Sequence, residues 1–251
     1  MQKVFLLLIS VLFLSTSFYK RDTRKFITEK NNLMILPIAK KEAPAKKASS
    51  LAEEVYLSIN FENINRLNAD VFYKAFLGFE NLKKAGELDG NSHLLTICDF
   101  SLSSNVKRLW VIDVHEGKVV FNSLVAHGKN TGEEFAEKFS NTESSLQSSL
   151  GFYITESTYD GSNGYSLKLL GMDDGYNDKA LERAIVMHGA DYVSENFIKN
   201  EKRLGRSWGC PAVPKELAEP IINTIKGKNC LFIYAPDQNY LANSKWLKTT
   251  I

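Results

Sequence analysis

The chain has 251 residues, of which 44% are hydrophobic, 11% aromatic and 24% charged, as in an ordinary globular protein. Its 15 Gly and 6 Pro exclude collagen-like and low-complexity classes. The net charge of +2 combines two unlike parts: residues 1–50 hold ten Lys and Arg against three Asp and Glu, and residues 51–251 hold 21 against 26. Because the larger part is acidic, we expect no nucleic-acid partner.

The first 17 residues have the layout of a secretory signal peptide. Lys3 precedes an apolar run over residues 4–14, and the small residues Ser15 and Ser17 follow it. The run is shorter than the roughly 20 residues that span a bilayer as a helix, so an uncleaved anchor or a buried N-terminal strand is the weaker alternative. We therefore expect an exported protein, periplasmic or associated with the cell envelope, with no stable membrane span after signal cleavage.

Residues 18–50 mix basic residues with Ala, Pro and Ser and predict a basic linker. An N-terminal helical segment is expected over residues 51–90, because apolar residues recur at helical spacing in residues 68–88 and a shorter helix is expected around residues 51–59. Asn68 or Asp70 would cap the longer helix, which would end near Gly86.

Short β-like runs separated by turn residues follow in residues 91–236, the expected catalytic domain. They are residues 93–100, 108–114, 119–126, 151–155, 165–169 and 184–188. The second and third runs predict a hairpin across residues 115–118. One late helix is expected at residues 214–226, and residues 237–251 are expected to be a tail. The pattern predicts a mainly β (α+β) fold, an antiparallel sandwich or a barrel-like domain.

Two segments carry the candidate chemistry, RAIVMHGA (residues 183–190) and GRSWGCPAVP (residues 205–214). A thiol becomes a nucleophile when an imidazole or a helix N-terminus lowers its pKa, and backbone N–H groups at a Gly-Cys turn can hold an oxyanion. Cys210 and His188 fit acyl transfer through a thioester, although one Cys and one His alone are a weak signal. The other cysteines, Cys98 and Cys230, lie in apolar runs and are expected to be buried and inert, unless one disulfide forms.

A strand-terminal His-Gly followed by Ser-x-Gly-Cys resembles the YkuD-type murein L,D-transpeptidase catalytic domain family. The hairpin leading to VAHGKNTG and the segment SSLGFYIT (residues 148–155) fall in the family's order, and the resemblance covers roughly residues 68–236. It implies an L,D-transpeptidase-like β-sandwich. It also implies an acyltransferase that needs no metal or other cofactor and whose partners are peptidoglycan stem peptides.

Carried over by position, the resemblance makes Cys210 the nucleophile that attacks a stem tetrapeptide, releases D-alanine and forms a 3→3 cross-link. His188 would be the base, oriented by a backbone carbonyl for which Gly189 is the nearest candidate. The amides of Gly209 and Cys210 would form the oxyanion hole. With water as the acceptor, the same thioester would make an L,D-carboxypeptidase. A non-catalytic cell-wall-binding module, with Cys210 paired or buried, is the remaining alternative.

The chain departs from the family motif at two positions: Trp208 replaces a His, and Ala212 stands where Asn or Arg is usual. Arg206 or Arg203 would then take over carboxylate recognition, and together with Lys129 they should make the cleft positive. Ser207 and Trp208 are further candidates for substrate contacts. His127 also ends a β-like run on His-Gly, so it is an alternative base or a residue that lines the pocket.

Overall fold

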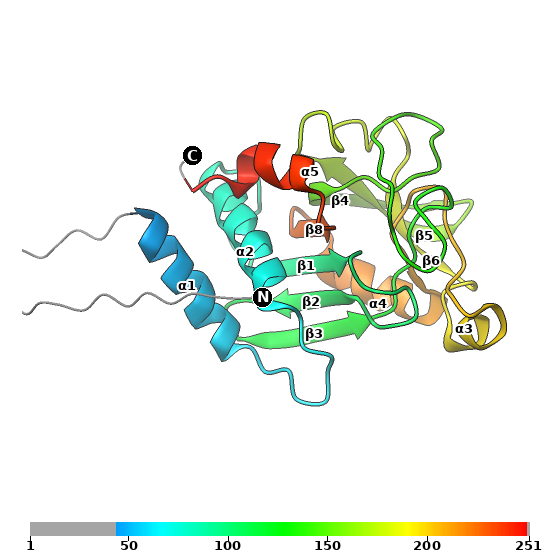
Figure 1. Cartoon of the computed structure of the whole chain (residues 1–251), viewed down its shortest axis with the longest axis horizontal. Helices are drawn as coiled ribbons and strands as arrows, with labels where there is room; N and C mark the ends of the chain where they lie inside the picture. Colours follow the sequence, from blue (N-terminus) through cyan, green and yellow to red (C-terminus); the bar gives the residue numbers. More distant parts are fainter. Residues whose placement is uncertain (1–43, 250–251) are drawn as a thin grey trace, which may run out of the picture. The chain divides into compact units, whose positions relative to one another are not determined.

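Eight strands form a single mixed sheet in the order β3-β2-β1-β8-β4-β5-β6-β7 (Figure 1). The strands are β1 (Leu94–Asp99), β2 (Leu109–Asp113), β3 (Lys118–Ser123), β4 (Gly151–Gly161), β5 (Gly164–Gly171), β6 (Val186–Ala190), β7 (Ala212–Pro214) and β8 (Cys230–Tyr234). The structure is a computed structural model that describes residues 44–249. The signal peptide and most of the basic linker lie outside the described residues.

Most neighbouring strands are antiparallel, and the two exceptions bring distant segments of the chain together. β8 runs parallel to β1, and β7 runs parallel to β6. The hairpin expected across residues 115–118 joins β2 and β3, which pair antiparallel. The mainly β expectation is thus confirmed, and the hydrogen-bonded strands form one continuous sheet.

Five α-helices accompany the sheet within residues 44–249. They are α1 (Pro44–Ser58), α2 (Ala69–Lys84), α3 (Glu195–Glu201), α4 (Lys215–Ile225) and α5 (Gln238–Asn243), and a short 3-10 helix, η1 (Lys245–Leu247), follows α5. α2 begins at the expected cap, where the Asn68 side chain accepts from the N–H groups of Asp70 and Val71. Its apolar face, which includes Phe72 and Phe79, is buried and contacts β1 and β8.

The C-terminal residues are part of the core, so the expectation of a tail over residues 237–251 is wrong for its described part. Tyr240 is fully buried, and Trp246 is nearly so. The Asp173 carboxylate accepts hydrogen bonds from Tyr240 Oη at 3.2 Å and from Ser244 Oγ at 2.5 Å. α5 was missed because one turn and a half carries too little periodicity to be recognised, and its stability comes from these contacts.

Cys98 and Cys230 lie on neighbouring strands, and the strand register keeps them apart. Cys230 is opposite Leu95, whereas Cys98 is opposite Ile233, three positions along the same pair of strands. Three positions correspond to roughly 10 Å and to opposite faces of the sheet, beyond the span of a disulfide. Both thiols are free and fully buried. Among residues 44–249, no helix combines the length and apolarity needed to cross a membrane.

Candidate active site

The turn that carries Cys210 is held by hydroxyl groups on both sides. Ser207 Oγ accepts from the Gly209 N–H at 3.0 Å and donates to the Cys210 carbonyl at 2.6 Å. Ser148 Oγ donates to the Gly209 carbonyl at 3.2 Å. Gly209 has a φ of +127°, and a Cβ at this position would lie 2.7 Å from the Gln147 carbonyl oxygen. Only glycine fits this backbone, so the turn has one conformation that sets the direction of the cysteine.

The Cys210 side chain is free, 8% exposed and directed at the start of β6. The Val186 N–H donates to Sγ at 3.5 Å, and the thiol lies 3.7 Å from the Ala184 carbonyl oxygen. Burial raises the pKa of the Cys210 thiol, while the N–H groups of Val186 and Cys210 and the charge of Arg183 act in the opposite direction. The resting thiol is therefore protonated at neutral pH.

His188 lies on β6 in register with Ala212 of β7, two residues beyond Cys210. Its Nδ1 is 2.9 Å from the Gly189 carbonyl oxygen. A carbonyl can only accept, so Nδ1 carries the proton and the lone pair of Nε2 is available as a base. Burial lowers the pKa of His188, which is therefore neutral at pH 7.

Gly189 allows β6 to approach α4 closely. A Cβ at this position would lie 2.9 Å from Ala218 Cβ and 3.0 Å from Lys215 Cα. Because successive residues of a strand face opposite sides of a sheet, His188 faces away from α4. The glycine thus fixes the distance between strand and helix, and its carbonyl orients the imidazole.

His127 has no free ring nitrogen, in contrast to His188. Arg108 Nη2 donates to His127 Nδ1 at 2.8 Å, and Nε2 lies 3.2 Å from the Gly132 carbonyl oxygen, to which it donates. The side chain is 1% exposed, and burial lowers its pKa to about 4. His127 therefore neither accepts a proton from a substrate-side group nor lines an open pocket. The neighbouring Arg108 also donates to the carbonyls of Val125 and Leu102, so this pair supports the backbone beside the Cys210 turn.

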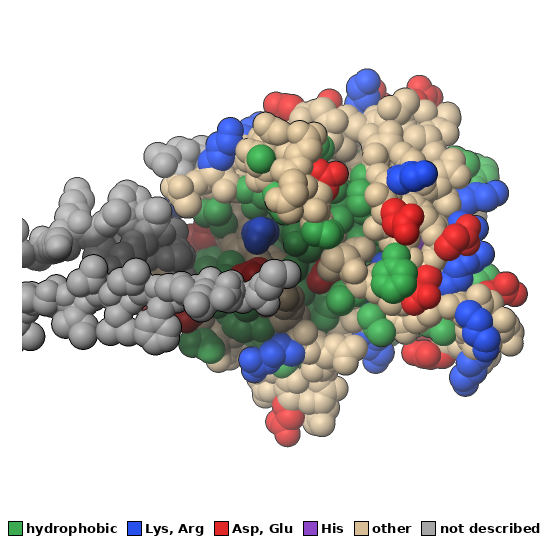
Figure 2. Space-filling view, viewed as in Figure 1, with side chains coloured by type: hydrophobic (Ala, Val, Ile, Leu, Met, Phe, Trp, Pro, Cys, Tyr) green, Lys and Arg blue, Asp and Glu red, His purple; other side chains and the backbone are tan. Residues whose placement is uncertain are grey.

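The two candidate arginines bind the same carboxylate of this chain. Glu133 accepts from Arg203 Nε at 2.9 Å and from Arg206 Nη1 at 2.6 Å. Arg206 Nη1 also lies 3.1 Å from the carbonyl oxygens of Lys129 and Gly132. Acidic and basic side chains alternate over the face shown in Figure 2. Glu133 therefore offsets part of the positive charge that the two arginines were expected to bring to the cleft, and the expectation of a positive cleft stays a prediction.

Of the remaining predicted residues, Ser207 and Gly209 hold the turn that carries Cys210, and Trp208 is exposed. Ser207 is 4% exposed, and both its hydrogen bonds hold the turn, so it supports Cys210 where a substrate contact was expected. The Gly209 N–H, an expected oxyanion donor, is bound to Ser207. The Cys210 N–H faces its own thiol. Trp208, two residues before Cys210, is 77% exposed, so its ring is open to solvent.

The L,D-transpeptidase catalytic domain family matches residues 63–234. The chain belongs to this family. Among solved structures, an L,D-transpeptidase from Mycobacterium smegmatis is similar at 10% identity and a TM-score of 0.36, over 57% of this chain and 59% of that one. L,D-transpeptidase 3 from Mycobacterium tuberculosis is similar at 11% identity and a TM-score of 0.36, over 57% of this chain and 61% of that one.

The helical cell shape determining protein from Campylobacter jejuni is similar at 16% identity and a TM-score of 0.36, over 66% of this chain and 55% of that one. The chain thus spans less than two thirds of the length of these structures. No curated protein sequence matches it. The assignment to the L,D-transpeptidase family accordingly depends on the match to the family itself, which supports an acyltransferase of this type.

Two further residues, Arg183 and Tyr192, act on the Cys210 thiol or respond to it, and the family motif gives a role to neither. Arg183 lies in the turn before β6, and its guanidinium acts on the Cys210 thiol. Tyr192, two residues after β6, is close enough for the Cys210 charge to raise its pKa, after the larger effect of burial. Arg183 opens the RAIVMHGA segment, so its position was visible, but the loop that it binds lies more than 30 residues away in sequence.

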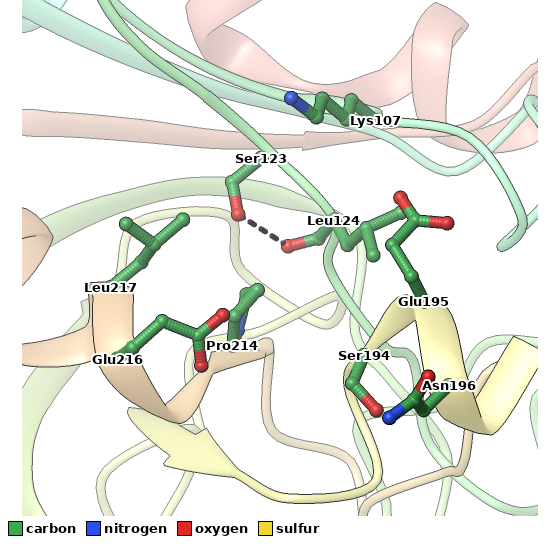
Figure 3. A pocket seen from close by; sticks show the side chains of 9 residues that line it. All are labelled: Lys107, Ser123, Leu124, Ser194, Glu195, Asn196, Pro214, Glu216 and Leu217. Atoms are coloured by element: carbon green, nitrogen blue, oxygen red, sulfur yellow. Dashed lines mark hydrogen bonds between the residues drawn. The ribbon is translucent and has the colours of Figure 1, made fainter.

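A cavity of about 430 Å³ lies elsewhere, where β3, α3 and α4 meet (Figure 3). Its apolar walls come from Leu124, Pro214 and Leu217, and the carboxylates of Glu195 and Glu216 lie at its rim. Residues of α4 line the cavity, whereas the His188 side chain lies on the side of β6 that faces away from α4. Neither Cys210 nor His188 lines this cavity. Within residues 44–249, no group of three or more His, Cys, Asp or Glu side chains is arranged to hold a metal ion.

Proposed function

We propose that this protein is an exported, cysteine-dependent L,D-transpeptidase that acts on peptidoglycan stem tetrapeptides through a Cys210 thioester. The proposal rests on two groups at β6. The free Cys210 thiol accepts from the Val186 N–H at the start of this strand, and His188 on the same strand has an available Nε2. Membership of the family supports the reaction class. Export is supported by the signal-like sequence of residues 1–17.

In the first half-reaction, Cys210 Sγ attacks the carbonyl carbon of the L-centred residue that precedes the terminal D-alanine. His188 Nε2 accepts the thiol proton as the C–S bond forms. We assign the oxyanion donor to the Cys210 N–H, which does not take part in the Ser207 bridge. The imidazolium then protonates the leaving nitrogen, the amide C–N bond breaks and D-alanine departs.

In the second half-reaction, an amine of another stem peptide attacks the thioester. His188 takes its proton, a new C–N bond forms, the C–S bond breaks and the thiol is restored, giving a 3→3 cross-link. If water attacks in place of the amine, the product is a tripeptide, which is the L,D-carboxypeptidase alternative. We assign the exposed ring of Trp208 to substrate contact, where it offers a stacking surface.

A carbapenem tests the nucleophile because its strained lactam is an acyl donor. We expect intact-mass spectrometry to show one covalent adduct on the wild type and on Cys98→Ala, a matched control at a fully buried thiol. Cys210→Ala should show none. A wild-type protein that stays unmodified at saturating drug would falsify the proposal. Incubation with a disaccharide tetrapeptide then separates cross-linked dimer from released tripeptide, and so separates the transpeptidase from the carboxypeptidase.

A further inference from the structure

Arg183 joins the Cys210 site to a loop that is distant in sequence. Its Nη1 donates to the Ser140 carbonyl at 2.8 Å and to Ser149 Oγ at 2.5 Å. Its Nη2 donates to Ser145 Oγ at 3.1 Å and to the Gln147 carbonyl at 2.8 Å. Four hydrogen bonds from one planar fork fix residues 140–149 far more strongly than a single contact, because all four must break together.

The loop held by Arg183 forms the wall behind the nucleophile turn. The Gln147 carbonyl oxygen, which Arg183 binds, is the atom that lies 2.7 Å from a Cβ placed on Gly209. The adjacent Ser148 donates to the Gly209 carbonyl. Ala184, the residue after Arg183, has a φ of +54°, and its carbonyl lies against Cys210 Sγ. Arg183 thus reaches the cysteine through both the loop and its own backbone.

The charge of Arg183 has no acidic partner among the described residues, unlike that of Arg203 or Arg206. Its Nε is buried without a hydrogen-bond acceptor. A partly buried guanidinium in this state favours an anion nearby, and the nearest group that becomes anionic in the proposed reaction is the Cys210 thiolate.

The other ionisable groups around the thiol carry no charge at neutral pH. His188 on β6 is neutral because burial lowers its pKa, and Tyr192 is neutral because burial raises its pKa to about 12. Among the described residues, Arg183 is the side chain whose charge lowers the pKa of the Cys210 thiol, against the larger effect of burial. Burial lowers the pKa of Arg183 from its ordinary value, and the charge of Cys210 acts in the opposite direction. Arg183 therefore supplies a positive charge at this site at neutral pH.

We propose that Arg183 is a positioning residue for the Cys210 nucleophile, which locks residues 140–149 against the cysteine turn and stabilises the thiolate that forms when His188 takes the proton. This inference rests on the proposed function, in which Cys210 is the nucleophile. Part of the activation of the Cys210 thiol then comes from an arginine five residues before His188. The family resemblance assigns this activation to the imidazole of His188.

The test measures the Cys210 thiol without any substrate. The rate of alkylation by iodoacetamide is followed from pH 6 to 11, with the modified peptide identified by mass spectrometry so that Cys98 and Cys230 are scored separately. We expect Arg183→Gln to raise the apparent pKa of the thiol by about 1, which lowers alkylation below that pKa about tenfold. Arg66→Gln, at an arginine that lies over the rings of Tyr56 and Phe61, is the matched control and should leave the titration unchanged.

Arg183→Lys keeps the charge but loses the fork, which makes the test independent of whether the glutamine variant folds. We expect its thiol pKa to stay within about 0.3 of the wild type, while amide hydrogen exchange of residues 140–149 becomes at least tenfold faster. A folded Arg183→Gln variant with an unchanged thiol pKa overturns the proposal. So does an Arg183→Lys variant whose loop exchanges at the wild-type rate. Failure of the carbapenem adduct would instead overturn the proposed function, because alkylation reports on the thiol alone.

Discussion

Gly209 offers a test of whether the backbone at the nucleophile turn is as tightly constrained as its geometry indicates. Gly209→Ala places a Cβ at a φ of +127°, 2.7 Å from the Gln147 carbonyl oxygen and 3.0 Å from Ile185 Cδ1. The backbone conformation alone costs a side-chain-bearing residue about 1–3 kcal/mol. The contact with a backbone oxygen adds about 1–2 kcal/mol, because that oxygen is held by Arg183 and cannot move freely.

The total loss of stability expected for Gly209→Ala is about 2–5 kcal/mol. For a domain of this size, 1 kcal/mol lowers the Tm by about 2–4 °C, so thermal unfolding should occur about 4–20 °C earlier. Gly227→Ala is the matched control, because Gly227 also has a positive φ, +84°, and nothing lies within 4 Å of its added Cβ. That variant should lose only about 1 kcal/mol, a Tm decrease of about 2–4 °C.

The comparison also has a functional side. Gly209→Ala moves the Cys210 amide and thiol together, so acylation by a carbapenem should slow by more than tenfold even at temperatures where the variant is folded. Gly227→Ala should be acylated at the wild-type rate. Equal Tm decreases in the two variants would refute the reasoning, since they would show that the loop carbonyl behind Gly209 moves aside without resistance.

Three further outcomes are expected. Burial lowers the pKa of His188 below its ordinary 6.5 and raises that of the Cys210 thiol above 9.0. The rate of carbapenem acylation should therefore rise with pH below 6.5, as His188 loses its proton, and then stay level to about pH 9. A rise centred above pH 7 would contradict a neutral imidazole and a neutral thiol at rest. His127→Leu removes one of the acceptors of the buried Arg108 and should lower stability by about 1–3 kcal/mol with acylation retained. His188→Gln should instead keep its Tm and lose at least 100-fold in acylation. Removal of residues 237–251 should destabilise the protein by roughly 5 kcal/mol, because two buried aromatic side chains and two hydroxyl donors to a buried carboxylate are lost. Thermal unfolding followed by circular dichroism measures the loss, and an unchanged melting curve would restore the interpretation of these residues as a tail.

The sequence predicts those elements whose own pattern determines them. α2 has an apolar stripe at helical spacing and a capping asparagine, and both the helix and its cap are where the pattern places them. The hairpin of β2 and β3 likewise depends on neighbouring residues. β7 has only three residues and becomes a strand because β6 and the bridge at Ala126 pair with it. β8 is a five-residue apolar run, which periodicity does not distinguish from a buried helical segment.

The candidate site divides in the same way. The proposed pair of Cys210 and His188 is predicted from local motifs, because a Gly-Cys turn and a strand-terminal histidine leave a short sequence signature. The choice between His188 and His127 is not local, since both precede glycine at the end of a β-like run. It depends on the atoms next to the rings: Gly189 leaves Nε2 of one ring free, while Arg108 and a carbonyl occupy both nitrogens of the other.

Charge shows most directly why a site is not the sum of its residue types. Arg203 and Arg206 lie close to Cys210 in sequence and therefore seemed suited to bind a substrate carboxylate, but Glu133, about 70 residues earlier, reaches both. Arg183 lies on the other side of the motif, has no acidic partner within residues 44–249, and donates to neutral groups of residues 140–149. An arginine paired with a carboxylate stays charged, but the carboxylate offsets its electrostatic field, whereas the field of an arginine whose hydrogen bonds all go to neutral acceptors is not offset. The positions of the acidic side chains therefore determine which arginine acts on the Cys210 thiol, and the fold sets those positions.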